Sequence, residues 1–76
     1  MTIEDALKLV NVDSSEIIRD SSEEDKDCVV FGTYHGEQID VYDNGNKFVV
    51  GFGAGRKNYK IYKDSGKVDV FQIIVA

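Results

Sequence analysis

The sequence predicts an α+β domain, in which a short N-terminal helix packs on one face of a roughly five-stranded antiparallel meander sheet. The first observation is a set of five runs rich in valine, isoleucine, tyrosine and phenylalanine, whose stiff or flat side chains suit a pleated, half-buried surface. The second is the short loops of glycine, asparagine and aspartate between the runs, because such loops join antiparallel neighbours. The third is an apolar stripe with helical spacing near the N-terminus. The five runs are Cys28–Tyr34, Glu37–Asp43, Lys47–Phe52, Asn58–Lys63 and Val68–Val75.

The N-terminal helix is predicted from its cap and its apolar stripe. Thr2 followed by Asp5 provides a hydroxyl cap and an acid that satisfy free backbone N–H groups. Asn11 can end the helix. A helix this short does not persist alone, so it is expected to dock on the sheet. The apolar stripe consists of Ile3, Ala6, Leu7 and Val10.

The segment that follows the helix is less well determined. Asp13-Ser14-Ser15-Glu16 repeats the capping pattern, but Ile17 and Ile18 fit either a second short turn or a sixth strand. Residues 20–27 contain no apolar side chain and are predicted to form an acidic loop. The chain is therefore expected to be one domain over residues 1–76. Its parts are a helical N-terminal segment (1–19), the acidic loop (20–27) and the antiparallel sheet (28–76).

The last run differs from the others in its alternation. Ile39 and Val41 share one face of their strand, as half-buried strands require. In the last run Val68 and Val70 set one phase, whereas Phe71 begins another. A bulge near Phe71, or burial on both faces of the strand, would explain the change.

The composition limits the possible classes of protein. A chain of 76 residues buries only about 60–65% of its unfolded surface, but a hydrophobic fraction of 42% suffices for a globular core. One cysteine and one histidine allow neither an internal disulfide nor the usual structural zinc site, and we expect no metal and no cofactor. No window approaches the roughly 18 apolar residues of a membrane span. Acids occupy the N-terminus where a secretory signal would carry bases, so we expect a cytoplasmic protein.

Charge is distributed unevenly along the chain. The net charge is −5; residues 1–27 hold nine acids against three bases, whereas residues 28–76 hold five acids against six bases. This asymmetry makes nucleic acid an unexpected partner for the whole molecule and favours a basic protein partner.

The segment from Gly51 to Lys57 is the loop most similar to a functional one. Gly53 and Gly55 could let backbone N–H groups converge on an anion, with Arg56 and Lys57 adding positive charge. This pattern supports the alternative of a small-molecule or nucleotide binder. The segment lacks the spacing of a P-loop, and a glycine-rich hairpin between two strands is the simpler interpretation.

A basic-aromatic strip on the fourth run offers a second alternative. Lys60, Tyr62 and Lys63 could hold a single strand of nucleic acid by stacking and phosphate contacts. Lysines on an exposed strand also guard against edge-to-edge aggregation, which is the simpler interpretation. His35 precedes a glycine and is interpreted as a turn residue, because no nucleophile or second histidine accompanies it. We therefore expect no catalytic residues.

These observations favour a non-enzymatic protein-interaction module, such as a small acidic cytoplasmic accessory, inhibitor or immunity-type protein. Its partner would be a protein, for example a basic one that itself binds nucleic acid, and binding should weaken with salt. The run 68–75 is apolar on both faces and could pair with a second copy if it lies at a sheet edge. The residues predicted to bind the partner are Asp20, Glu23, Glu24, Asp25, Asp27, Phe71 and Ile73.

Overall fold

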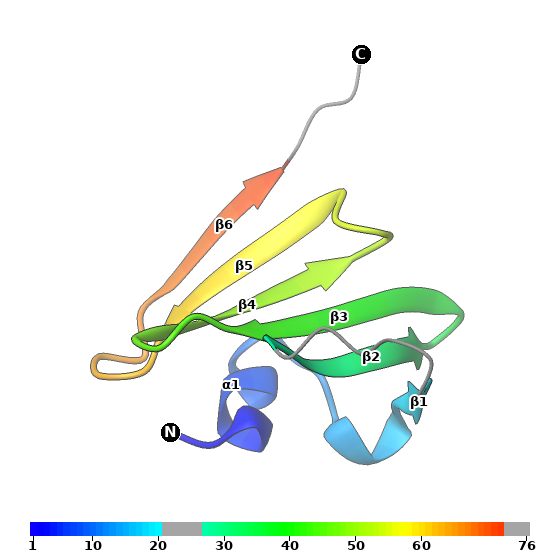
Figure 1. Ribbon diagram of the computed structural model, residues 1–76, viewed down its shortest axis with the longest axis horizontal. Coiled ribbons are helices and arrows are strands. Elements are labelled where there is room, and N and C mark those ends of the chain that lie inside the picture. The colour runs from blue at the N-terminus through cyan, green and yellow to red at the C-terminus, as the bar shows by residue number, and fades with distance from the viewer. Residues whose placement is uncertain (21–26, 73–76) are drawn as a thin grey trace.

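The computed structural model describes residues 1–20 and 27–72 and shows a short helix beneath a twisted antiparallel sheet (Figure 1). The sheet is six-stranded, and its strand order β1-β2-β3-β4-β5-β6 follows the chain. The predicted α+β meander is therefore confirmed. The elements are α1 (Ile3–Leu9), the 3₁₀ helix η1 (Ser14–Glu16), β1 (Ile18–Arg19), β2 (Cys28–Tyr34), β3 (Glu37–Asp43), β4 (Lys47–Phe52), β5 (Lys57–Tyr62) and β6 (Val68–Gln72).

The helix α1 begins with the predicted capping box. The backbone N–H of Asp5 donates to the Thr2 hydroxyl at 3.1 Å, and the Thr2 N–H donates to the Asp5 carboxylate at 3.2 Å. Asn11 lies just beyond the helix with φ of 60°, a left-handed conformation that asparagine tolerates. In the described part of the chain, no helix is long and apolar enough to cross a membrane.

Both alternatives left open at Ile17 and Ile18 occur: Ile17 caps the short 3₁₀ helix η1, and Ile18 begins a sixth strand. Ile18 pairs with Thr33 and Arg19 pairs with Gly32, so β1 adds a two-residue edge to β2. Gly32 makes this approach possible, because a Cβ at that position would collide with the backbone oxygen of Ile18. Ile17 itself turns inward and is 9% exposed.

The hydrophobic core lies between α1 and one face of the sheet. Leu7 and Ala6 of the helix are fully buried against β-strand side chains. We call this side of the sheet the covered face, and Figure 1 shows α1 and η1 on that side. The core consists of Ala6, Leu7, Val12, Ile17, Val30, Ile39, Val41, Phe48, Val50 and Ile61.

The strand boundaries match the sequence prediction for β2, β3 and β4 and shift by one residue at β5. The predicted bulge near Phe71 is wrong within the described residues, because the β5–β6 register runs unbroken from Ile61↔Val68 to Lys57↔Gln72. The irregularity lies instead in β2, between Cys28 and Val30. The alternative explanation fits better, since Val68 packs on the core while Phe71 is partly buried on the opposite face.

Candidate binding surfaces on the sheet

The face opposite α1 carries a continuous surface of aromatic and polar side chains. Directly paired residues of an antiparallel sheet share a face, so the register assigns each side chain to one side. In the part of the chain that the structure describes, neither helix packs on this side (Figure 1), and we call it the open face. Its residues include Phe31, Gln38, Asp40, Tyr42, Lys47, Val49, Gly51, Asn58, Lys60, Tyr62, Asp69 and Phe71.

One row of the open face crosses five strands from β2 to β6. It runs through Phe31, Asp40, Gly51, Asn58 and Phe71, each paired with the next. A shallow groove of about 600 Å³ follows this row. Both phenylalanines are partly buried, so the row combines apolar ends with a polar centre.

Gly51 forms the floor of that polar centre. The position that a Cβ would occupy at Gly51 lies 2.9 Å from Asn58 Oδ1 and still closer to Asp40 Oδ1. Because Gly51 has no side chain, the oxygens of Asp40 and Asn58 can occupy the space above its Cα from both sides. Asn58 is only 8% exposed, and its amide nitrogen donates to the Gly55 carbonyl at 2.7 Å.

The Asp40 carboxyl is partly buried in this centre. Burial raises its pKa above the ordinary value, while hydrogen bonds from the Gln38 side chain and the Gly51 backbone act in the opposite direction. Among the described residues Asp40 has no ion-pair partner. The sheet therefore contains a half-buried acid that forms no ion pair with a cation of the described chain.

The predicted nucleic-acid strip is divided between two surroundings. Lys60 and Tyr62 lie on the open face, and Lys60 Nζ is 5.1 Å from the centroid of the Phe71 ring. Lys63 instead forms an ion pair with Asp43, with 2.7 Å between Nζ and Oδ1. The hydrogen bond from Lys63, followed by the one from the Gly45 backbone, lowers the pKa of Asp43. Of the three residues predicted to contact nucleic acid, Lys60 and Tyr62 thus share the open face, whereas Lys63 is paired with Asp43.

The glycine-rich loop between β4 and β5 contains three consecutive left-handed residues. Gly53, Ala54 and Gly55 have φ values of 63°, 59° and 85°. The Gly53 N–H donates to the Gln38 carbonyl at 2.9 Å, and a Cβ at Gly53 would lie 3.0 Å from the Glu37 carboxylate. The loop thus has an acid beside Gly53 and one of its N–H groups already bonded. Arg56 and Lys57 are exposed, and anion binding by this loop stays a prediction.

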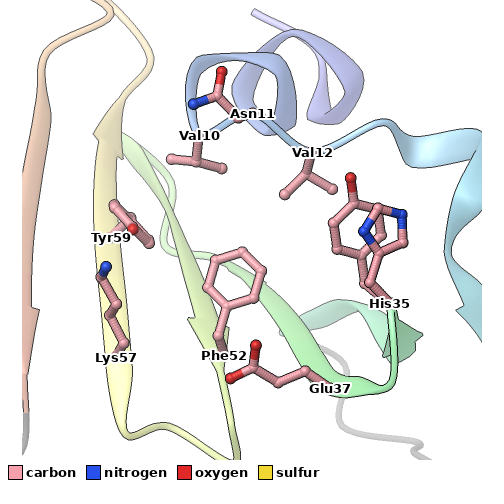
Figure 2. A pocket seen from close by; sticks show the side chains of 9 residues that line it. Val10, Asn11, Val12, His35, Glu37, Phe52, Lys57 and Tyr59 are labelled. Atoms are coloured by element: carbon pink, nitrogen blue, oxygen red, sulfur yellow. The ribbon is translucent and has the colours of Figure 1, made fainter.

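A separate hollow of about 300 Å³ lies on the covered face, beyond the C-terminal end of α1 (Figure 2). The Phe52 and Tyr59 rings meet edge to face there, with 5.8 Å between their centroids. His35 stacks on Tyr34 at 4.0 Å, and its Nε2 lies 3.3 Å from the Glu16 carboxylate. His35 occupies the β2–β3 turn with φ of 50°, as interpreted from the sequence. In the described chain no three His, Cys, Asp or Glu side chains are grouped as metal ligands.

The described residues that were predicted to bind a partner lie in separate parts of the sheet. The Asp20 N–H donates to the Phe31 carbonyl at 2.8 Å, and the Asp27 carbonyl accepts from the Asp43 N–H at 2.9 Å. Both acids are thus attached beside β2 or β3, whereas Phe71 lies on the far edge strand β6. Glu23, Glu24, Asp25 and Ile73 lie outside the described residues.

The sequence prediction did not include Asp40, Asn58 or Phe31. The row that joins them exists only through strand pairing, which the sequence pattern does not show. One available signal was Gly51, a glycine inside a strand, which often marks a close approach of neighbouring groups.

Comparison with known proteins shows no relative of this chain, since no protein-family model, no curated protein and no solved structure matches it.

Proposed function

We propose that the protein is a non-enzymatic protein-binding module that holds a basic partner protein against the open face. The observation that supports this proposal is the gathering of large side chains on that face. Phe31, Tyr42, Val49, Tyr62 and Phe71 come from five successive strands and are all partly exposed. Aromatic side chains of this kind are enriched at the centres of protein interfaces.

The charge of the chain supports a basic partner. With a net charge of −5, the protein attracts a basic surface over long range and repels nucleic acid. The role of a small accessory, inhibitor or immunity-type protein fits a domain of 76 residues that binds through one face. A cytoplasmic location is part of the same proposal, because the single Cys28 suits a reducing compartment.

The proposal is tested by capturing proteins from the native cell on the immobilised chain. The test variant combines Tyr62→Ala and Phe71→Ala on the open face. The control variant is Leu9→Ala, which removes an exposed apolar side chain (47% exposed) from α1. We expect one basic protein to be held by the wild type and the control, and its retention to fall by about tenfold or more in the test variant.

Equal retention by the test variant would place the interface elsewhere and contradict the proposal. Retention should also decrease steeply between low and high salt, because the charge attraction is screened. Salt-independent retention would contradict the basic nature of the partner.

A second candidate is self-association through β6. This strand pairs with β5 on one side only, and Val70 is 55% exposed on it. An exposed edge strand can add a strand from a second copy, extending the sheet across the contact. Sedimentation of the wild type at high concentration should then show a dimer, and Val70→Lys should shift it to the monomer. A wild type that stays monomeric would contradict this candidate.

A further inference from the structure

We propose that the polar centre of the open face binds the guanidinium group of an arginine side chain from the partner protein. We call this centre the Gly51 pit: its floor is Gly51, its walls are Asp40 and Asn58, and Phe31 and Phe71 flank it. The proposal rests on the proposed function and specifies the chemistry by which the partner is recognised.

Two acceptor oxygens, from Asp40 and Asn58, converge over Gly51. Asn58 Oδ1 lies 2.9 Å from the Cβ position at Gly51, and Asp40 Oδ1 approaches the same point from the opposite wall. The amide nitrogen of Asn58 is held by the Gly55 carbonyl at 2.7 Å, which fixes the amide with its oxygen toward the pit. A group entering the pit must therefore donate hydrogen bonds to both walls. An apolar group there would leave two acceptors without water, which is unfavourable.

The negative charge of Asp40 has no countercharge within the described part of the chain. This carboxyl is partly buried and has no ion-pair partner in the described part of the chain. Its raised pKa shows that the hydrogen bonds from Gln38 and Gly51 do not offset the loss of water. A cation that binds over the pit would supply the missing countercharge.

The two oxygens and the neighbouring Phe31 ring favour arginine over lysine as the bound side chain. A guanidinium group is planar and presents a rigid fork of donors, which matches two oxygens that converge from opposite sides. It also stacks on aromatic rings, and Phe31 is the direct cross-strand neighbour of Asp40. The Phe71 ring already has Lys60 Nζ 5.1 Å from its centroid, so we assign the stacking to Phe31. The ammonium group of lysine is a compact charge, so it cannot donate to both oxygens in one plane or stack flat on the Phe31 ring.

The other charges of the open face limit where the arginine can bind. Lys60 and Asp69 are paired in the row next to the pit, and Lys47 lies on β4 beyond that row, opposite Tyr62. Lys67 Nζ approaches Asp69 at 3.9 Å, so this second acid already has a countercharge. Asp40 is therefore the open-face acid to which we assign an incoming cation, and Asp69 provides a matched control.

The test is a titration of the ¹⁵N-labelled chain, followed by amide chemical shifts, with three probes: N-acetyl-arginine amide, N-acetyl-lysine amide and N-acetyl-citrulline amide. We expect saturable shifts of the amides of Asp40, Gly51 and Asn58 with the arginine probe. The neutral citrulline probe, which keeps the shape but loses the charge, should bind about tenfold more weakly. The lysine probe should be weaker than the arginine probe.

Two variants complete the test. Asp40→Asn keeps the size of the side chain and should weaken the arginine probe by about tenfold or more. Asp69→Asn removes a carboxylate from the same face and should change the affinity by less than about twofold. The dispersion of each spectrum shows whether the variant is folded.

The inference is overturned if no shift at Gly51 saturates, if citrulline or lysine binds as well as arginine, or if Asp40→Asn binds unchanged. A basic partner captured through the open face equally well by the wild type and by Asp40→Asn would also overturn it, while the proposed function would stand. Arginine binding in the pit without any partner on the open face would support the chemistry of the pit and contradict the proposed function.

Discussion

The two faces of the sheet are built from the same strands but differ in burial and in the chemistry of their side chains. On β4, Val50 points to the covered face and is fully buried, whereas its neighbour Val49 points to the open face and stays partly exposed. The covered face contains apolar side chains packed against α1, and it supplies most of the stability. The open face contains aromatic rings around a half-buried acid, and its side chains remain partly exposed. The difference indicates which face is available for binding.

The largest expected contrast comes from the same truncation on each face. Val50→Ala should lower the free energy of unfolding by about 2–3 kcal/mol, because it removes buried methyl groups and leaves a cavity. Val49→Ala should lower it by about 1 kcal/mol or less, since neighbouring side chains and water can fill the space. Urea unfolding of both variants measures the difference. Equal losses would show that the open face is packed as tightly as the core.

A smaller contrast is expected at the two strand glycines. A Cβ at Gly32 meets the backbone of β1, which cannot move without breaking the pairing, so Gly32→Ala should cost about 1–2 kcal/mol. A Cβ at Gly51 meets first the carboxylate of Asp40, the end of a half-buried side chain that can rotate, so Gly51→Ala should cost less. Unfolding measurements compare the two variants. A larger loss for Gly51→Ala would show that its walls are rigidly held.

The same glycine variant also addresses the binding site. The Cβ of Gly51→Ala displaces the Asp40 carboxylate, so the two oxygens no longer converge, and the variant should abolish the amide shifts caused by N-acetyl-arginine amide. Gly32→Ala lies on the covered face and should leave those shifts unchanged wherever the variant remains folded.

The smallest effects are expected from the two acids of β3, and they differ in sign. The pKa of Asp40 is raised by burial, so its ionised form opposes folding and Asp40→Asn should stabilise the protein at neutral pH. The pKa of Asp43 is lowered by Lys63, so its ionised form favours folding and Asp43→Asn should destabilise at the same pH.

Both differences from the wild type should vanish on acidification. The Asp40 difference fades as the pH falls through its raised pKa to below the ordinary value of 3.8, and the Asp43 difference fades as the pH falls through its lowered pKa. Urea unfolding across this range measures both. Differences of the same sign at neutral pH would contradict the contrast between the two acids.

The fold could be predicted largely from the sequence, because its signals are local. The alternation of side chains and the turn residues give the bounds of β2, β3 and β4 without knowledge of the pairing. β1 could not be assigned, since two residues are too few to show a period. The Gly51 pit was missed for a different reason: Asp40, Gly51 and Asn58 are separated along the chain and meet only through the register of three strands.

The strand order has a consequence for how the domain forms and opens. Every strand pairs with its neighbours along the chain, so each pairing joins segments that are close in the sequence and the sheet can assemble hairpin by hairpin. Such a sheet can also open from its ends. Amide hydrogens of β6 should exchange with solvent before those of β3 and β4, which are paired on both sides. A partner that binds across the row from Phe31 to Phe71 would contact both the edge strand β6 and the inner strands β3 and β4. It should therefore slow amide hydrogen exchange most at β6.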